Sequence, residues 1–131
     1  MAEHPHIDIV GRALRAVSVG DTAALQQLLT RDCVIHLPGS HPLAGEHKGV
    51  DAALDLVRRM REETDNTIRF EPQQMFVDGH GHVIGVRRFM ADRRGRSRDM
   101  VGAVLCTVIG DRVASAEAFE SDLDQTDEFW A

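Results

Sequence analysis

A change of hydrophobic period near Thr67 constrains the fold of this 131-residue chain more than any other feature of its sequence. Before Thr67, apolar residues recur every three or four positions, as they do along one face of a helix. After it, Ile68 and Phe70 begin runs in which apolar and polar residues alternate, as they do along a half-buried strand. The sequence therefore predicts a helical first half followed by a sheet.

Three helices are expected in the first half. The first has Pro5 in its opening turn and Gly20 as its stop, and its apolar residues form one stripe. Asp21 can cap a second, shorter helix that ends near residues 31–32. After Gly49 the helical spacing returns, with charged residues on the face opposite the apolar one.

One short strand interrupts these helices and carries the first candidate for chemistry. Residues 34–37 favour a strand, and Pro38-Gly39 requires the backbone to turn directly after it. His36 lies at the end of this strand, and imidazole titrates nearer neutrality than any other common side chain. We therefore expect His36 to face either the core or a cavity.

The second half predicts longer strands that are joined mostly by tight turns. Pro72 interrupts the first of them, as a bulge would. The run from Met100 to Ile109 is apolar on both faces, so we expect helices to cover one face and a partner subunit the other. Residues 122–130 can add a closing helical turn. The four strands are expected at residues 68–77, 83–91, 99–109 and 112–119.

These elements are expected to form one α+β domain over residues 1–131, since no repeat or linker divides the chain. Helices on one side of a strongly curled antiparallel sheet enclose a conical cavity. The predicted architecture is therefore a cone-shaped curled antiparallel sheet that is closed by three N-terminal helices.

Composition and charge exclude several classes of partner. The net charge is −6, with both signs spread along the chain, which does not suit nucleic-acid binding. The basic run from Arg93 to Arg98 contains a glycine and precedes Asp99, as in a solvated hairpin tip. The first six residues lack the apolar core of a signal peptide, and no apolar run approaches the roughly 20 residues that span a bilayer. We therefore expect no membrane partner and a cytoplasmic location.

Cysteine and histidine positions do not predict a metal site or another cofactor. Cys33 and Cys106 both lie in apolar runs, which is typical of reduced, buried thiols. Two closely spaced histidine pairs, at positions 4 and 6 and at positions 80 and 82, have no third ligand placed with them. No metal and no cofactor are expected.

A set of landmarks extends over nearly the whole chain: Gly20-Asp21, Asp32, His36, Pro38-Gly39, Pro42-Leu43-Ala44-Gly45, Gly49, Gly110-Asp111-Arg112-Val113 and Phe129-Trp130. Together with the order of the elements, these landmarks resemble the SnoaL-like group of the nuclear transport factor 2-like superfamily. The resemblance implies a cone-shaped α+β barrel with a largely apolar pocket, usually assembled as a homodimer through the sheet. The superfamily includes cyclases, isomerases, hydrolases, dehydratases and pure binders, so the fold alone does not identify a function.

Only some of the family's functional residues have counterparts in this sequence. In ketosteroid isomerases a carboxylate base precedes a similar loop, and His36 lies at or beside that position. The isomerase phenol corresponds to a residue near Ala13, and its neutral acid to a residue near Val104. Because the chain contains no tyrosine, an oxyanion hole made of a phenol and a neutral acid cannot form.

The acids of two other enzyme classes are replaced as well. Resemblance to the superfamily's epoxide hydrolases matches their arginine to Arg88, but Met90 and Ala118 take the places of their two carboxylates. Ala118 also stands where the SnoaL-type cyclases carry an acid on the last strand. A strand bulge could turn Glu117 or Glu120 inward instead, although we expect both to be surface carboxylates.

The predicted catalytic residues are His36, as an acid or base, and Arg88, which would orient the substrate or neutralise developing negative charge. Arg88 is in phase with apolar residues of its strand; if that parity is reversed, Arg87 points inward instead. The rest of the predicted pocket wall is apolar and rich in methionine. It comprises Val34, Met60, Met75, Val86, Met90, Met100, Val104, Cys106 and Ala118.

Two functions are consistent with this sequence. One is a small-molecule enzyme that acts by proton transfer on a hydrophobic carbonyl or polycyclic substrate. The other is a non-catalytic module for hydrophobic-ligand binding or dimerisation that has lost the family's catalytic acids. In both, the expected partners are a hydrophobic small molecule and a second copy of the chain.

Overall fold

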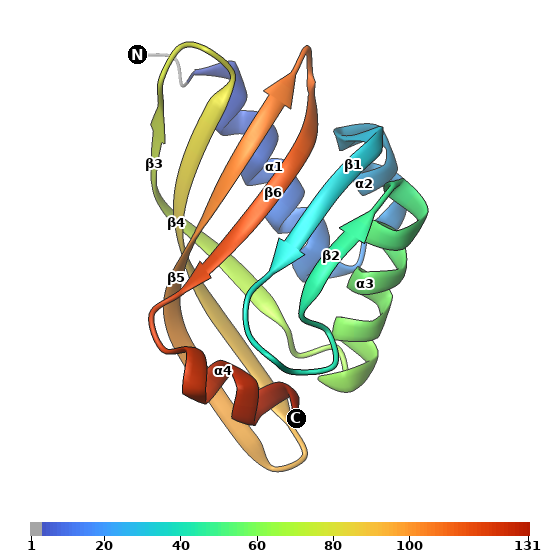
Figure 1. The fold of residues 1–131 in the computed structure, drawn as a ribbon, viewed down its shortest axis with the longest axis vertical. Helices are drawn as coiled ribbons and strands as arrows, with labels where there is room; N and C mark the ends of the chain where they lie inside the picture. Colours follow the sequence, from blue (N-terminus) through green and yellow to red (C-terminus); the bar gives the residue numbers. More distant parts are fainter. Residues whose placement is uncertain (1–3) are drawn as a thin grey trace.

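A computed structural model describes residues 4–131 and, within them, four helices and one six-stranded sheet (Figure 1). Residues 1–3 therefore lie outside the described residues. They are half of the N-terminal segment that was considered above as a signal peptide. In chain order the elements are α1 (Pro5–Val19), α2 (Thr22–Leu28), β1 (Leu29–Leu37), β2 (Gly45–Lys48), α3 (Val50–Glu63), β3 (Arg69–Val77), β4 (His82–Arg93), β5 (Arg96–Ile109), β6 (Arg112–Glu120) and α4 (Leu123–Trp130).

The three predicted helices form, and their ends follow the expected signals. Gly20 ends α1 in the left-handed conformation with φ of 75°, which glycine adopts at little cost. Asp21 caps α2 through a 3.0 Å hydrogen bond that its side chain accepts from the Ala24 N–H. However, α2 ends at Leu28, earlier than predicted, because the chain enters β1 directly at Leu29.

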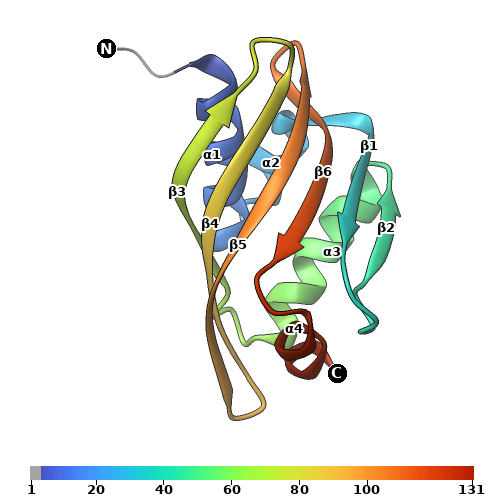
Figure 2. The ribbon, with the colours of Figure 1, turned by 60° about the vertical axis from the view of Figure 1, so that its left-hand side comes forward.

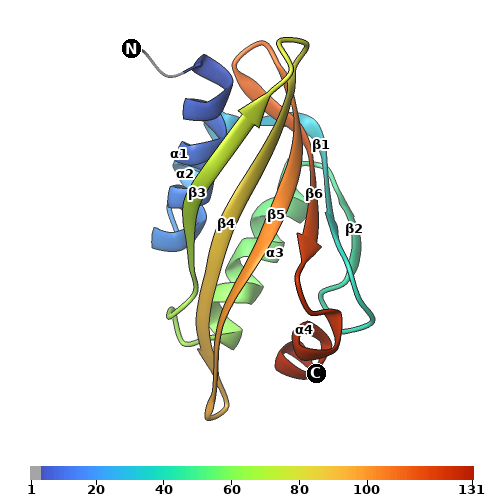
Figure 3. The ribbon, with the colours of Figure 1, turned by 90° about the vertical axis from the view of Figure 1, so that its left-hand side faces the viewer.

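The sheet has the strand order β2-β1-β6-β5-β4-β3 and does not close on itself. All neighbouring strands are antiparallel except β1 and β6, which are parallel. The short strand β2 was not predicted. Helices α1, α2 and α3 lie on the same side of the curled sheet (Figures 2 and 3). This is the predicted α+β architecture, with one parallel pair in an otherwise antiparallel sheet.

Two of the register shifts in the sheet help to set which side chains face the helices. The register of β3 against β4 shifts between Pro72 and Met75, as the proline predicted. The register of β5 against β6 shifts between Thr107 and Val108. Because side chains alternate along a strand, one extra residue in β6 allows both Val113 and Glu120 to face the helices.

Helix α4 lies at the end of the sheet where β6 stops (Figure 3). The guanidinium of Arg93 is buried and its Nη1 donates to the carbonyls of Phe129 and Ala131, at 3.0 and 2.8 Å. The Ser40 N–H donates to Asp127 of the helix at 2.8 Å. The expectation of a wholly solvated basic hairpin is therefore wrong, since Arg93 anchors the C-terminal helix.

The outer face of the sheet carries exposed apolar side chains. Four of them are 47–51% exposed and lie on β3 to β6: Phe76, Ile84, Val101 and Phe119. A second copy of the chain would pack on this face, and the homodimer stays a prediction. No helix within residues 4–131 is long and apolar enough to cross a bilayer.

Candidate ligand cavity

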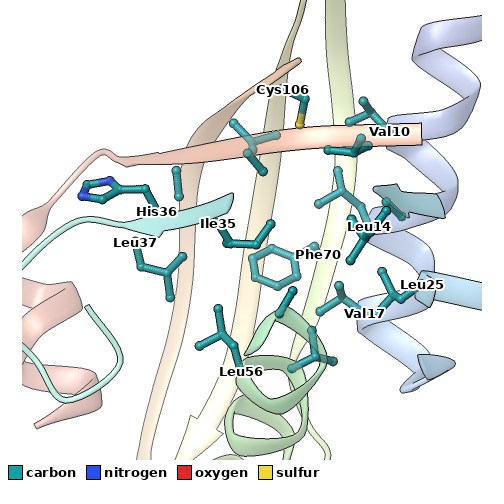
Figure 4. Close-up of a pocket in the computed structure, with 18 of the residues that line it drawn as sticks. Val10, Leu14, Val17, Leu25, Ile35, His36, Leu37, Leu56, Phe70 and Cys106 are labelled. Atoms are coloured by element: carbon teal, nitrogen blue, oxygen red, sulfur yellow. The ribbon is translucent and has the colours of Figure 1, made fainter. Parts of the chain in front are cut away.

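A cavity of about 140 Å³ lies between the helices and the concave face of the sheet. Its wall is almost wholly apolar, and Figure 4 shows Leu14 and Val17 of α1, Leu56 of α3 and Phe70 of β3 around it. Alanines on β6 leave the space open, since Ala116 and Ala118 face inward where longer side chains would fill it. The cavity is therefore an apolar hollow between the helices and the sheet.

Arg87 lines this cavity and forms a buried ion pair with Glu120, which lies in the wall of a smaller adjoining cavity. Arg87 Nη2 donates to Glu120 Oε1, and the two side chains are only 4% and 9% exposed. The guanidinium also lies over the Phe70 ring, 5.1 Å from its centroid. Arg87 Nη1 is buried and has no hydrogen-bond partner among the described residues. A residue in the wall of the apolar cavity therefore carries an unmet donor, which is shielded and lies against the Gly102 position.

Gly102 makes room for this guanidinium. It pairs with Glu120 across β5 and β6, directly beside the ion pair. A Cβ atom at position 102 would lie 2.3 Å from Arg87 Nη1 and 2.6 Å from the Phe119 carbonyl oxygen. Both separations are far below van der Waals contact, so only glycine allows Arg87 its observed place.

A second, smaller cavity of about 40 Å³ adjoins the same ion pair beneath α4. Arg87 and Glu120 form part of its wall, together with His41, Thr126 and Trp130. Both ring nitrogens of His41 are occupied: Nδ1 accepts from the Leu43 N–H at 3.1 Å, and Nε2 lies 3.1 Å from the Pro38 carbonyl oxygen. Burial lowers the pKa of His41 despite nearby carboxylates, so the ring is neutral at pH 7.

Arg88 does not point into the cavity, which corrects the sequence-based assignment. It lies on the outer face of β4, where its Nε donates to Asp99 Oδ1 at 2.6 Å and its side chain is 41% exposed. The reason is strand alternation: β4 buries Gly85, Arg87 and Phe89, so the residues between them face outward. The alternative considered above, Arg87, is the residue that lines the cavity.

His36 borders the cavity with its strand, but its ring points away from the other lining side chains (Figure 4). In the sheet it is opposite Glu117, whose side chain is exposed on the outer face. His36 Nδ1 is buried without a hydrogen-bond partner among residues 4–131. The structure therefore does not bring His36 and Arg88 together in the cavity.

The other predicted pocket residues divide between the two faces. Met60, Val104, Cys106 and Ala118 line the main cavity, and Met100 lines the smaller one. Val86 and Met90 share the outward parity of Arg88, and Val34 shares that of His36, so placing these three in the pocket was wrong. Met75 packs beside Gly85 and lines neither cavity.

Two chemical properties of the wall follow from burial. Both cysteines are buried free thiols, and desolvation raises the pKa of Cys106 to about 12. Cys106 is therefore an apolar wall residue and not a nucleophile. Within residues 4–131, no group of three or more His, Cys, Asp or Glu side chains is arranged to hold a metal ion.

Sequence reasoning missed Glu120 as a cavity residue, because it expected a surface carboxylate there. The useful signal was the possible bulge in the last strand, since that bulge turns Glu120 inward. Glu117 is exposed, as expected.

Comparison with known proteins adds family information to this geometry. A family model described as "SnoaL-like domain" matches residues 10–116. An uncharacterized protein of Mycobacterium tuberculosis (strain ATCC 25618 / H37Rv) is 33% identical over 131 residues, with 100% of both chains covered. The structure of Bal32a, from a soil-derived mobile gene cassette, has a TM-score of 0.93 at 29% identity over 97% of each chain.

A third similarity concerns the fold alone. A nuclear transport factor 2-like (NTF2-like) protein of unknown function from Burkholderia pseudomallei K96243 has a TM-score of 0.85 at 15% identity. The match covers 98% of this chain and 99% of that one. The curled sheet and its helices are therefore shared with proteins of very different sequence.

Proposed function

Because the chain belongs to the SnoaL-like domain family, we propose that it is a small-molecule enzyme that transfers a proton on a hydrophobic carbonyl compound. The observation that supports this proposal is the unmet donor of Arg87, a residue that lines both the apolar cavity and the adjoining smaller cavity in which its partner Glu120 lies. An apolar molecule with one carbonyl oxygen would fill the cavity and satisfy that donor.

The two charged residues would have complementary roles. Arg87 Nη1 donates a hydrogen bond to the carbonyl oxygen and stabilises the negative charge that develops there. Glu120 accepts a proton from the carbon next to the carbonyl. The C–H bond breaks, its electron pair forms the C=C bond of an enolate, and the carbonyl π electrons move to the oxygen. Returning the proton to carbon completes an exchange or an isomerisation.

The alternative is a non-catalytic binder with the same cavity. It is favoured by Ala118, which lines the cavity at the place where the SnoaL-type cyclases carry an acid. In that case Glu120 would only neutralise Arg87 and would not exchange protons with the ligand. The two functions differ in one measurable property, which is turnover at carbon.

Hydrogen–deuterium exchange distinguishes them. Acetophenone is a suitable probe because its single ring matches a cavity of this size. In D₂O, NMR should show the wild-type protein exchanging the methyl protons faster than buffer, and Glu120→Gln should reduce that rate by about 100-fold or more. Equal rates for the wild type, Glu120→Gln and buffer, with acetophenone bound, would establish the binder.

Matched controls use residues whose side chains point away from the cavity. Arg88→Ala and His36→Gln should retain the exchange rate, since neither side chain points to the proposed reacting atoms. A loss of exchange in either variant, with its stability unchanged, would contradict the assignment of Arg87 and Glu120.

A further inference from the structure

We propose that Glu120 makes the cavity selective for a neutral, single-ring carbonyl compound over a carboxylate of the same shape. The inference rests on the proposed function and names the class of ligand for it. It follows from the charges that line the two adjoining cavities, from the one donor of Arg87 without a partner and from the size of the main cavity.

The charges that line the two cavities disfavour an anionic ligand. Arg87 is the only cation, and Glu120 the only carboxylate, among the described residues that line the two cavities. The two side chains are in direct contact and are almost wholly shielded from water, so their charges cancel. A ligand carboxylate would add a second negative charge beside Glu120 with no second cation to balance it.

The neutral and acidic groups beside the ion pair do not attract an anionic ligand. The His41 ring belongs to the wall of the smaller cavity, and both of its nitrogens already serve backbone groups. Thr126 and Trp130, from α4, carry no charge. Asp127 in the same helix is a further carboxylate and is bound to Ser40. None of these groups therefore offers a positive charge to an anionic ligand.

The donor of Arg87 without a partner favours a ligand that carries one hydrogen-bond acceptor. Arg87 Nη2 is used by Glu120, whereas the buried Nη1 has no partner among the described residues. Nη1 is shielded by the chain, so one carbonyl oxygen would satisfy it, without adding a full charge, once the Arg87 side chain turns toward the cavity. An apolar ligand without an acceptor would leave the donor unmet and should bind less tightly.

The volume of the main cavity limits the size of the ligand. The main cavity has about 140 Å³, close to an engineered apolar cavity of about 150 Å³ that holds benzene. A single ring with a short carbonyl substituent matches this space. A polycyclic ligand would require the helices or the sheet to move.

Calorimetric titration with three probes of similar shape tests the inference. Acetophenone has a neutral acceptor, benzoate has an anionic one, and α-methylstyrene has none. The wild type should bind acetophenone about tenfold more tightly than α-methylstyrene, and benzoate least tightly of the three. Benzoate binding the wild type as tightly as acetophenone would overturn the inference, without any variant being needed.

Two variants sharpen the test. Glu120→Gln removes the carboxylate charge but keeps an oxygen for Arg87, so benzoate should gain about tenfold or more relative to acetophenone. Glu117→Gln, on the outer face of the same strand, should leave that ratio unchanged. An unchanged ratio in folded Glu120→Gln would overturn the inference.

The proposed function and this inference fail in different ways. Binding of all three probes with equal affinity overturns the selectivity and leaves the cavity a binding site. Binding of none of them to the wild type overturns the inference and removes the support for a one-ring substrate in the proposed function. Selective binding without proton exchange would support the inference and identify the protein as a binder.

Discussion

Arg87 and Arg88 are neighbours in sequence, and each pairs with one carboxylate, but they lie on opposite faces of the sheet. The Arg87–Glu120 pair is 4% and 9% exposed, whereas the Arg88–Asp99 pair is 41% and 52% exposed. Water screens the outer pair, so its contribution to stability is small. The inner pair is held in an apolar wall, where each charge depends on the other.

The two pairs have the same chemistry, so the comparison shows that burial determines how much the loss of one partner destabilises the protein. In the inner pair, the loss of one partner leaves a buried, uncompensated charge. In the outer pair, the remaining partner is solvated. Arg87 lies where it could contact a molecule bound in the cavity, whereas Arg88 lies on the outer surface and could not.

The largest effect is expected from Arg87→Met, which leaves Glu120 buried and unpaired. Urea unfolding should show a loss of about 3–5 kcal/mol in the free energy of unfolding. The double variant Arg87→Met with Glu120→Met should recover much of this loss, because two apolar side chains need no charged partner. A single variant as stable as the wild type would show that the pair is not desolvated.

An intermediate effect is expected from Gly102→Ala, which would place a Cβ atom against Arg87 Nη1 and the Phe119 carbonyl. The resulting displacement should cost about 1–3 kcal/mol in urea unfolding. Gly85→Ala is the matched control, because its Cβ would meet Val104 at 3.4 Å, an ordinary contact. Equal losses in the two variants would mean that Gly102 does not specifically accommodate Arg87.

The smallest effect is expected from Arg88→Ala, and it should depend on pH. The hydrogen bond from Arg88 lowers the pKa of Asp99 from its usual 3.8. A lowered pKa in the folded state stabilises the protein above the unfolded-state value, and that gain is lost as pH falls through the folded-state pKa. Arg88→Ala should therefore make stability fall slightly less between pH 5 and pH 2, by about the contribution of one exposed carboxylate.

Thermal unfolding over that pH range checks the expectation. Near neutral pH, the midpoint of Arg88→Ala should change far less than that of Arg87→Met. A loss as large as that of the buried variant would remove the distinction between the two faces.

Much of the fold could be predicted from the sequence because hydrophobic period and helix caps act locally. Gly20 and Asp21 define the end of α1 and the start of α2, and Pro72 marks its bulge. Strand β2 escaped prediction because four residues cannot show a reliable period, and its pairing with β1 is a tertiary contact.

The site was less predictable because it depends on strand parity. A shift of one residue reverses the face on which every side chain of a strand lies. The sequence is compatible with either Arg87 or Arg88 facing the cavity. Glu120 faces inward only because β6 contains a bulge, which the sequence permits but does not require. Val104 and Cys106 were placed correctly in the wall, although their strand is apolar on both faces and its composition alone does not show which face lies inward.

The bulge in β6 also bears on how this chain can change in length during evolution. Deleting a single codon at position 114 or 115 would remove the extra residue and leave Ala118 and Glu120 facing inward. Deleting the codon for Glu117 would instead turn Phe119 inward and Glu120 outward, filling the hollow and removing its acid. Relatives that differ by one residue at the first place can keep the same chemistry, whereas those that differ at the second cannot.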